Sequence, residues 1–345
     1  MAAASSSTVA QWEQLNHQFA EVADGITLHY IDVGPRDATP VVLVHGWPDL
    51  AFTWRHQVGP LSDKFRVIAP DLRGFGRSSA PREVEAYGSK IVTSDLAKLL
   101  DHLNLPRAVF VGHDWGGSIV YRMAMYHPRR VLAVASFCTP YEPPTRRFVD
   151  AVELVTRFPA FSYVQFLADT EAASAHLEAA PRELFTAVFR APLEKPDSAS
   201  PVTFLHVLLG VGHSPHRFYK LRSNLLSEDE LEFYVREFAA SGFKGGVNYY
   251  ATRAADFAAE RGLPRVLPHP VLYVGAGWDP VLTPELAAHM PRVVPNLEVA
   301  LVETASHWLL WSHKSETTAL LLQWLAKIEA GAGGGDAPTV SVARL

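Results

Sequence analysis

The stretch Gly112-His113-Asp114-Trp115-Gly116 follows the apolar run Ala108–Val111 and precedes a helical pattern from Ser118 to Tyr126. A strand that turns sharply into a helix needs small residues around the turn, because neighbouring backbone segments come close together there. The motif has the form Gly-x-nucleophile-x-Gly, with aspartate where serine usually stands. We expect this turn to lift Asp114 above a sheet and to place the backbone N–H of Trp115 beside it.

Other short apolar runs alternate with helical patterns around this motif. Runs rich in β-branched residues, without polar alternation, indicate strands buried on both faces of a parallel sheet. Strands that alternate with helices predict a doubly wound α/β core. A hairpin signal at Asp24-Gly25 comes first, and the further runs are Val41–Val44, Val67–Ala69, Val131–Phe137, Val271–Val274 and Val299–Val302.

The alternation breaks in the middle of the chain, where aromatic-rich helical patterns replace the strands. We therefore expect a helical cap at residues 140–262 over a core made of residues 18–139 and 263–330. Residues 1–17 are expected to be a disordered N-terminus. The Gly-rich end, residues 331–345, is expected to be a flexible tail.

Composition excludes several functional classes. The chain has 345 residues, 48% of them apolar, and a formal net charge of −5. These values suit a soluble protein with a large core and no basic surface for nucleic acid. No apolar run is long enough to span a membrane. A single cysteine, Cys138, excludes an internal disulfide and a cysteine-based zinc site, and nothing in the sequence implies a metal or cofactor. The sequence does not indicate an oligomeric state.

Two further residues complete a catalytic pattern with Asp114. Asp279 follows the run Val271–Val274, and His307 follows the run Val299–Val302. The order nucleophile, acid, histidine is that of the α/β-hydrolase fold. Each residue comes just after a predicted strand, at the edge where open α/β sheets place their sites. An Asp114 that only caps a helix would not explain this agreement.

A second turn supplies the remaining part of such a site. His45-Gly46-Trp47-Pro48 ends the first buried strand, where the hydrolase fold provides an oxyanion-hole N–H. The N–H groups of Trp47 and Trp115 would form the oxyanion hole, and Pro48 is a candidate for a cis peptide. The Gly-rich stretch from Asp71 to Ser78 has no phosphate-loop lysine, and we interpret it as structural.

The aspartate determines the chemistry that we expect. A carboxylate that attacks an sp³ carbon forms an alkyl ester, which water activated by His307 can hydrolyse. Epoxides and alkyl halides are therefore both possible substrates. An opening epoxide leaves an alkoxide that needs a proton donor, whereas a halide leaves as a stable anion and needs only N–H donors.

The chain resembles the soluble epoxide hydrolases from about Gln18 to Ala330. The resemblance lies in His45-Gly46-Trp47-Pro48, in the Asp114 motif, in the stretch from Gly275 to Asp279 and in Ser306-His307-Trp308. It implies an α/β-hydrolase core with a helical cap, an epoxide substrate and no cofactor. It resembles the single-unit plant and microbial form of these enzymes.

The same resemblance implies two epoxide-binding tyrosines in the cap. Ser241 to Tyr250 is similar to a family stretch that ends Asn-Trp-Tyr, and Phe161-Ser162-Tyr163 is similar to the start of the other tyrosine segment. Tyr250 and Tyr163 are then the proton donors. The substrate would lie in an apolar pocket, for which we expect these walls: Trp47, Trp115, Phe161, Trp308 and Leu309.

Two alternatives remain open. Trp47 and Trp115 could also bind a halide, so a haloalkane dehalogenase is the second candidate enzyme. A non-catalytic ligand receptor on the same fold is the alternative of another class. The C-terminal Ala343-Arg344-Leu345 resembles a peroxisomal signal, so the expected location is cytoplasmic or peroxisomal.

Overall fold

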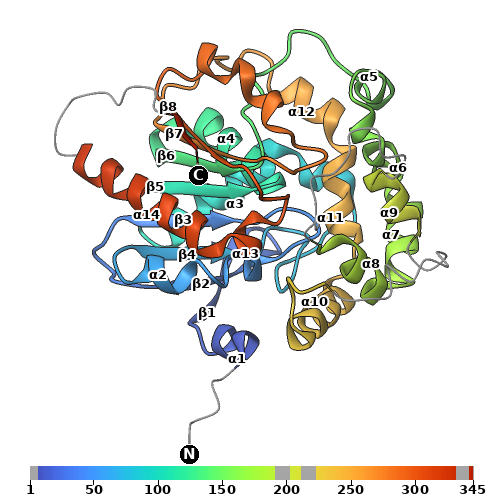
Figure 1. The fold of residues 1–345 in the computed structure, drawn as a ribbon, viewed down its shortest axis with the longest axis horizontal. Helices are drawn as coiled ribbons and strands as arrows, with labels where there is room; N and C mark the ends of the chain where they lie inside the picture. The colour runs from blue at the N-terminus through green and yellow to red at the C-terminus, as the bar shows by residue number, and fades with distance from the viewer. Residues whose placement is uncertain (1–6, 191–202, 211–222, 332–341, 345) are drawn as a thin grey trace, which may run out of the picture.

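The computed structural model describes residues 7–190, 203–210, 223–331 and 342–344. A nine-stranded sheet runs through the molecule in the order β1-β2-β4-β3-β5-β6-β7-β8-β9. Helices lie against the sheet, and a separate group of helices gathers beside it, on the right of Figure 1. The predicted α/β class is therefore confirmed.

All the predicted strands are present. They are β1 (His17–Ala23), β2 (Ile26–Val33), β3 (Pro40–Val44), β4 (Arg66–Pro70), β5 (Ala108–His113), β6 (Val131–Phe137), β7 (Val271–Ala276) and β8 (Leu297–Val302). The expected hairpin at Asp24-Gly25 joins β1 to β2, and β2 runs antiparallel to β4. From β4 through β8 the neighbouring strands are parallel, so their carboxyl ends lie along one edge of the sheet.

The helices of the core flank these strands. They are η1 (Ala51–Trp54), α2 (Val58–Ser62), η2 (Val84–Tyr87), α3 (Ser89–His102), α4 (Trp115–Tyr126), η3 (Pro128–Arg130), η7 (Pro284–Arg292), α13 (Leu309–Ser312) and α14 (Lys314–Gly331). Helix α4 follows the central strand β5 and packs against β5 and β6. This packing places the start of α4 at the middle of the carboxyl edge.

Only helices are described between β6 and β7. They are α5 (Ala151–Arg157), η4 (Pro159–Phe161), α6 (Tyr163–Ala168), α7 (Thr170–Glu178), α8 (Pro181–Val188), α9 (Phe204–Gly210), α10 (Glu228–Ser241), α11 (Lys244–Asn248), η6 (Tyr249–Ala251) and α12 (Arg253–Ala259). This helical segment, residues 140–262, is the group beside the sheet in Figure 1. Residues 191–202 and 211–222 of the expected cap lie outside the described residues.

The expectation of a disordered N-terminus is wrong for residues 7–17. Helix α1 (Thr8–Glu13) is capped by the Ser7 side chain, which accepts a hydrogen bond from the Ala10 N–H. Trp12 is buried, and its ring lies 5.4 Å from that of Phe52. Burial of this large aromatic side chain offsets the entropy lost when the segment becomes ordered. Residues 1–6 lie outside the described residues.

The expected flexible tail also needs correction. Helix α14 continues to Gly331, and strand β9 (Val342–Arg344) pairs in parallel with β8. The unpaired edge of β8 offers free backbone hydrogen-bonding groups, which accounts for the added strand. Residues 332–341 and Leu345 lie outside the described residues. Within the described part of the chain, no helix is both long enough and apolar enough to cross a membrane.

Candidate active site

Asp114 lies at the sharp turn between β5 and α4, with backbone angles φ 53° and ψ −122°. A non-glycine residue rarely adopts this positive φ, so the surrounding structure must enforce it. The turn needs glycine neighbours because a Cβ on Gly116 would lie 2.1 Å from the carbonyl oxygen of Val44. A Cβ on Gly46 would lie 2.5 Å from Asp114 itself. Gly116 is therefore required by close backbone contact, as predicted, and Gly46 is required by its contact with the Asp114 side chain.

The two predicted N–H donors meet the Asp114 carboxylate. The backbone N–H of Trp47 donates to Oδ1 of Asp114 at 2.8 Å, and the backbone N–H of Trp115 also donates to this carboxylate. Burial raises the pKa of Asp114, while His307 and the two N–H groups act in the opposite direction. The Trp47–Pro48 peptide bond is cis, as the sequence suggested.

His307 lies between the two predicted carboxylates. Its Nδ1 is 2.7 Å from Oδ2 of Asp279, and its Nε2 is 3.6 Å from Oδ2 of Asp114. Burial opposes protonation of His307, but the charge and hydrogen bond of Asp279, with the charge of Asp114, raise its pKa to about 9. The imidazole is therefore oriented with Nδ1 toward Asp279 and Nε2 toward Asp114.

Asp279 is itself held in place by backbone groups. The N–H groups of Val281 and Leu282 each donate to its Oδ1 at 2.9 Å. Burial alone would raise the pKa of Asp279, but the charge and hydrogen bond of His307 and these two N–H groups lower it below its ordinary value. Asp279 therefore stays ionised beside the imidazole.

Tyr163 and Tyr250 come from different parts of the helical segment, lie side by side, and are both close enough to Asp114 for its charge to affect them. Tyr163 begins α6, Tyr250 lies in η6, and their ring centroids are 5.9 Å apart. The Tyr250 ring also lies 5.1 Å from that of Trp115 and 5.5 Å from that of Trp47. Burial raises the pKa of both phenols well above 10, and the Asp114 charge adds to this effect. Both side chains are therefore neutral O–H donors.

The residues expected to line the substrate pocket differ in what they contact. Phe161 lies 6.3 Å from Tyr163, ring to ring, and the Trp308 ring lies edge-on to His307 at 4.8 Å. The Trp308 indole N–H donates to the Val188 carbonyl oxygen at 2.8 Å, so this side chain joins the helical segment to the core. Leu309 is fully buried in the hydrophobic core, and its place in a pocket wall stays a prediction.

Sequence reasoning missed several residues that support the site. His113 Nε2 donates to the backbone oxygen of His307 at 2.8 Å, and burial lowers the pKa of His113 to about 3, which keeps it neutral. Thr139 Oγ1 donates to the backbone oxygen of Asp114 at 2.6 Å. His113 lies inside the Asp114 motif, but neither residue type shows from sequence which backbone group it contacts.

Residues 45–50, between β3 and η1, form a loop that we call the Trp47 loop, and sequence analysis also missed a buried carboxyl group in it. Oδ1 of Asp49 accepts hydrogen bonds from the Tyr234 hydroxyl at 2.7 Å and from the Leu50 N–H at 2.8 Å. Burial raises the pKa of Asp49 to about 6. Tyr234 lies on α10, so this contact joins the helical segment to the Trp47 loop. The only sequence signal was a charged residue directly after His45-Gly46-Trp47-Pro48.

One group of described residues offers metal-ligand atoms. His113, Cys138 and His307 each present one, all within 4.8 Å of one another. His307 is hydrogen-bonded to Asp279, and His113 and Cys138 both donate to the His307 carbonyl oxygen. These contacts hold the main chain and the imidazole of His307 in place, and they account for the three side chains without a metal ion.

Comparison with known proteins agrees with this geometry. Residues 39–314 match the family model for the alpha/beta hydrolase fold, and residues 6–54 match the model for the epoxide hydrolase N terminus. Epoxide hydrolase A of Mycobacterium tuberculosis is 33% identical, over 89% of this chain and 96% of that protein. The fold is thus that of the α/β hydrolases. Within it, the chain belongs to the epoxide hydrolase family.

Two further comparisons define the extent of the similarity. The mouse protein bifunctional epoxide hydrolase 2 is 34% identical over 90% of this chain but only 55% of its own length, so the chain spans about half of it. The crystal structure of epoxide hydrolase A from Mycobacterium thermoresistibile has a TM-score of 0.79 and 29% identity, covering 91% of this chain and 98% of that one.

Proposed function

We propose that this protein hydrolyses epoxides to vicinal diols through a covalent alkyl ester on Asp114. The observation that supports this most directly is the arrangement around one carboxylate. Oδ1 of Asp114 accepts the Trp47 N–H, and Oδ2 is 3.6 Å from His307. Two neutral phenols, Tyr163 and Tyr250, lie side by side within reach of the Asp114 charge.

In the first step, Oδ2 of Asp114 attacks one epoxide carbon and the bond from that carbon to the epoxide oxygen breaks. The oxygen takes a proton from Tyr163 or Tyr250, while the other phenol donates a hydrogen bond to it. Since Oδ1 already accepts the N–H of Trp47, it becomes the ester carbonyl oxygen. The product of this step is a hydroxyalkyl ester.

In the second step, His307 takes a proton from water, and the resulting hydroxide attacks the ester carbonyl carbon. The N–H groups of Trp47 and Trp115 stabilise the negative charge that develops on Oδ1. The intermediate collapses with release of the diol alkoxide, which receives the proton from His307, and Asp114 is left as a carboxylic acid. Asp114 then loses its proton to solvent and the tyrosinate takes one up, so the starting protonation state is restored. Asp279 orients the imidazole and stabilises its charged form.

Formation of the ester also changes the pKa of the base, His307. The charge of Asp114 contributes to the raised pKa of His307, and the ester is neutral. The pKa of His307 therefore falls after alkylation, which increases the fraction of neutral imidazole when water must be activated.

We propose that residues 140–262 act as a cap and residues 18–139 and 263–330 as the core. The cap would supply Tyr163, Tyr250 and the Phe161 wall, and the core would supply the remaining polar groups. The substrate would lie between these two parts. This division is supported by the origin of the two tyrosines in α6 and η6.

The decisive experiment is a turnover panel of aryl, terpene and aliphatic epoxides beside 1-haloalkanes. Diol release from epoxides, with no halide release, is expected because phenols protonate an alkoxide, whereas a halide needs no proton. Halide release alone would favour the dehalogenase. Ligand binding without any turnover would favour the receptor.

For location, we propose the peroxisome, with Ala343-Arg344-Leu345 as the signal and the cytoplasm as the alternative. Pairing of Val342–Arg344 with β8 means that an import receptor would have to displace β9. A fluorescent protein fused to the N-terminus should mark peroxisomes, and deletion of the last three residues should abolish this pattern. A diffuse signal from the intact chain would contradict the proposal.

A further inference from the structure

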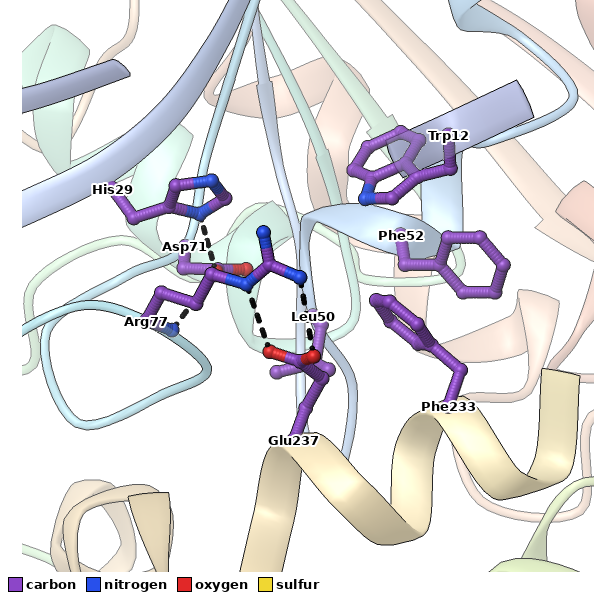
Figure 2. A pocket seen from close by; sticks show the side chains of 8 residues that line it. All are labelled: Trp12, His29, Leu50, Phe52, Asp71, Arg77, Phe233 and Glu237. Atoms are coloured by element: carbon purple, nitrogen blue, oxygen red, sulfur yellow. Dashed lines mark hydrogen bonds and ion pairs between the residues drawn. The ribbon is translucent and has the colours of Figure 1, made fainter. Parts of the chain in front are cut away.

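A row of three hydrogen bonds connects the loop after β4 to helix α1. Nδ1 of His29 is 2.7 Å from Oδ2 of Asp71, and Nε2 of His29 is 2.8 Å from Nδ1 of His17. Nε2 of His17 is in turn 2.9 Å from the carbonyl oxygen of Trp12. We call these four residues the histidine clasp. Figure 2 shows His29 against Asp71, with Trp12 nearby.

Both ends of the clasp accept hydrogen bonds. The Trp12 carbonyl oxygen has no proton to donate. Asp71 accepts the N–H of Ala51 at 2.9 Å on Oδ1, and the N–H of Arg77 at 3.2 Å on Oδ2 together with His29. Burial would raise the pKa of Asp71, but the charge and hydrogen bond of His29 lower it to about 2. Asp71 is therefore an ionised acceptor at neutral pH.

The proton count follows from these acceptors. Three hydrogen bonds need three ring N–H groups, and two neutral imidazoles provide only two. The clasp is complete only when His17 and His29 together hold one extra proton. Because His17 must keep its proton on Nε2 for Trp12, and burial lowers the pKa of His17, the extra proton belongs on His29 beside Asp71.

The surrounding charges agree with this assignment. Arg77 pairs with Glu13 of α1 and Glu237 of α10, and Arg236 pairs with the same two carboxylates. These two cations and two anions balance one another. On the other side of Asp71, burial lowers the pKa of His45, whose Nε2 accepts the N–H of Leu72. The negative charge of Asp71 is thus left to be matched by the extra proton.

Both ends of the clasp contact the segment that follows the Trp47 loop. Asp71 accepts the N–H of Ala51, the first residue of η1, and the Trp12 ring packs on Phe52 of the same element. This short helix begins four positions after Trp47, whose N–H binds Asp114.

We propose that His17 and His29 are positioning residues that share one extra proton and hold the Trp47 loop against Asp114. Their effect on turnover rests on the proposed function, but their protonation does not. When rising pH removes the extra proton, one of the three hydrogen bonds is lost. The clasp is therefore complete, and stabilises the protein fully, only while the extra proton is bound.

The proton count can be measured by NMR on protein labelled with ¹⁵N-histidine. At neutral pH the two rings should together carry three N–H protons, two of them on His29 and one on Nε2 of His17. Two neutral imidazoles at this pH would overturn the proposal. This measurement uses the unmodified protein, so it does not depend on any variant folding.

The variant His17→Phe keeps a ring but removes both hydrogen bonds of position 17. It should melt lower than the unmodified protein by about 3 °C at pH 6, with a smaller difference at pH 9. The matched control is Gln18→Ala, at an exposed and non-titratable position next to His17 on β1, which should show no pH-dependent difference. If His17→Phe lowered the melting temperature equally at both pH values, its effect would come from packing alone, and this would contradict the shared proton.

Turnover provides an independent readout. His17→Phe should slow alkylation at pH 6 more than at pH 9, because only the protonated clasp holds the loop. Failure of every epoxide to react, with the expected NMR pattern intact, would contradict the proposed function and leave the clasp standing.

Discussion

Nε2 of His307 lies 3.6 Å from Oδ2 of Asp114, beyond a hydrogen bond but close enough for the two charges to interact. The separation leaves the Asp114 carboxylate free to attack, while its charge helps to raise the pKa of His307 to about 9. The same imidazole can therefore serve as a counter-ion before the ester forms and as a base afterwards. The proposed mechanism depends on this relationship.

Replacing the base should trap the intermediate. In His307→Gln, Asp114 can still attack an epoxide, but no group activates water, so the alkyl ester should accumulate. Intact-mass spectrometry should show the protein plus one epoxide. The double variant with Asp114→Asn is the control and should stay unmodified. An unmodified mass for His307→Gln with saturating substrate would refute the two-step mechanism.

Removing the hydroxyl groups of Tyr163 and Tyr250 should slow the first step, the alkylation of Asp114. Tyr163→Phe and Tyr250→Phe should each slow alkylation by roughly a hundredfold, about 3 kcal/mol, by analogy with the removal of an oxyanion-hole donor. The double variant should be nearly inactive. Tyr249→Phe is a matched control, since the Tyr249 hydroxyl donates to the Arg73 carbonyl oxygen. Stopped-flow rates unchanged in both single variants would mean that the proton comes from elsewhere.

The fate of the water oxygen is fixed by which bond hydrolysis breaks. Attack at the ester carbonyl puts the water oxygen into Asp114, and the diol leaves with an oxygen of the carboxylate. After a single turnover in H₂¹⁸O, the label should be found in the peptide that contains Asp114, and the diol should be unlabelled. Label in the diol after one turnover would indicate direct attack of water on the epoxide.

The pH response of His307 should depend on Asp114. Removing the charge with Asp114→Asn imitates the ester and should lower the pKa of His307 from about 9, as read by histidine NMR. Because folding raises the pKa of His307, protonation of this residue stabilises the fold. The contribution is fully present below about pH 6.5 and is lost as pH rises through about 9. The stability difference between Asp114→Asn and the unmodified protein should change across the same range. An unchanged titration would contradict the coupling.

Anchoring of the N-terminal helix can be tested through Trp12, which is 4% exposed. Trp12→Ala should lower the free energy of unfolding by about 3 kcal/mol, since truncation of a large buried aromatic side chain destabilises a protein by about this amount. Trp12→Phe should cost less because most of the contact with Phe52 remains. Urea unfolding followed by circular dichroism would measure both. An unchanged midpoint for Trp12→Ala would mean that α1 adds nothing to the stability of the core.

The sequence alone determined the α/β class, the strands and the positions of Asp114, Asp279 and His307. These features are local: a buried strand needs an apolar run, and a turn as tight as that at Asp114 needs glycines beside it. The order of the three residues along the chain then indicates one edge of one sheet. The family resemblance, rather than any pattern in the residues, singled out Tyr163 and Tyr250 among eleven tyrosines.

Only the tertiary structure decided what depends on contact between distant segments. It placed Tyr163 of α6 beside Tyr250 of η6, buried Asp49 under Tyr234, and joined His17 to His29. It also ordered α1 and paired β9 with β8, where composition had indicated disorder. Burial, hydrogen-bond partners and the resulting pKa shifts are properties of packing, because the same side chain is a surface group or a buried acid according to what surrounds it.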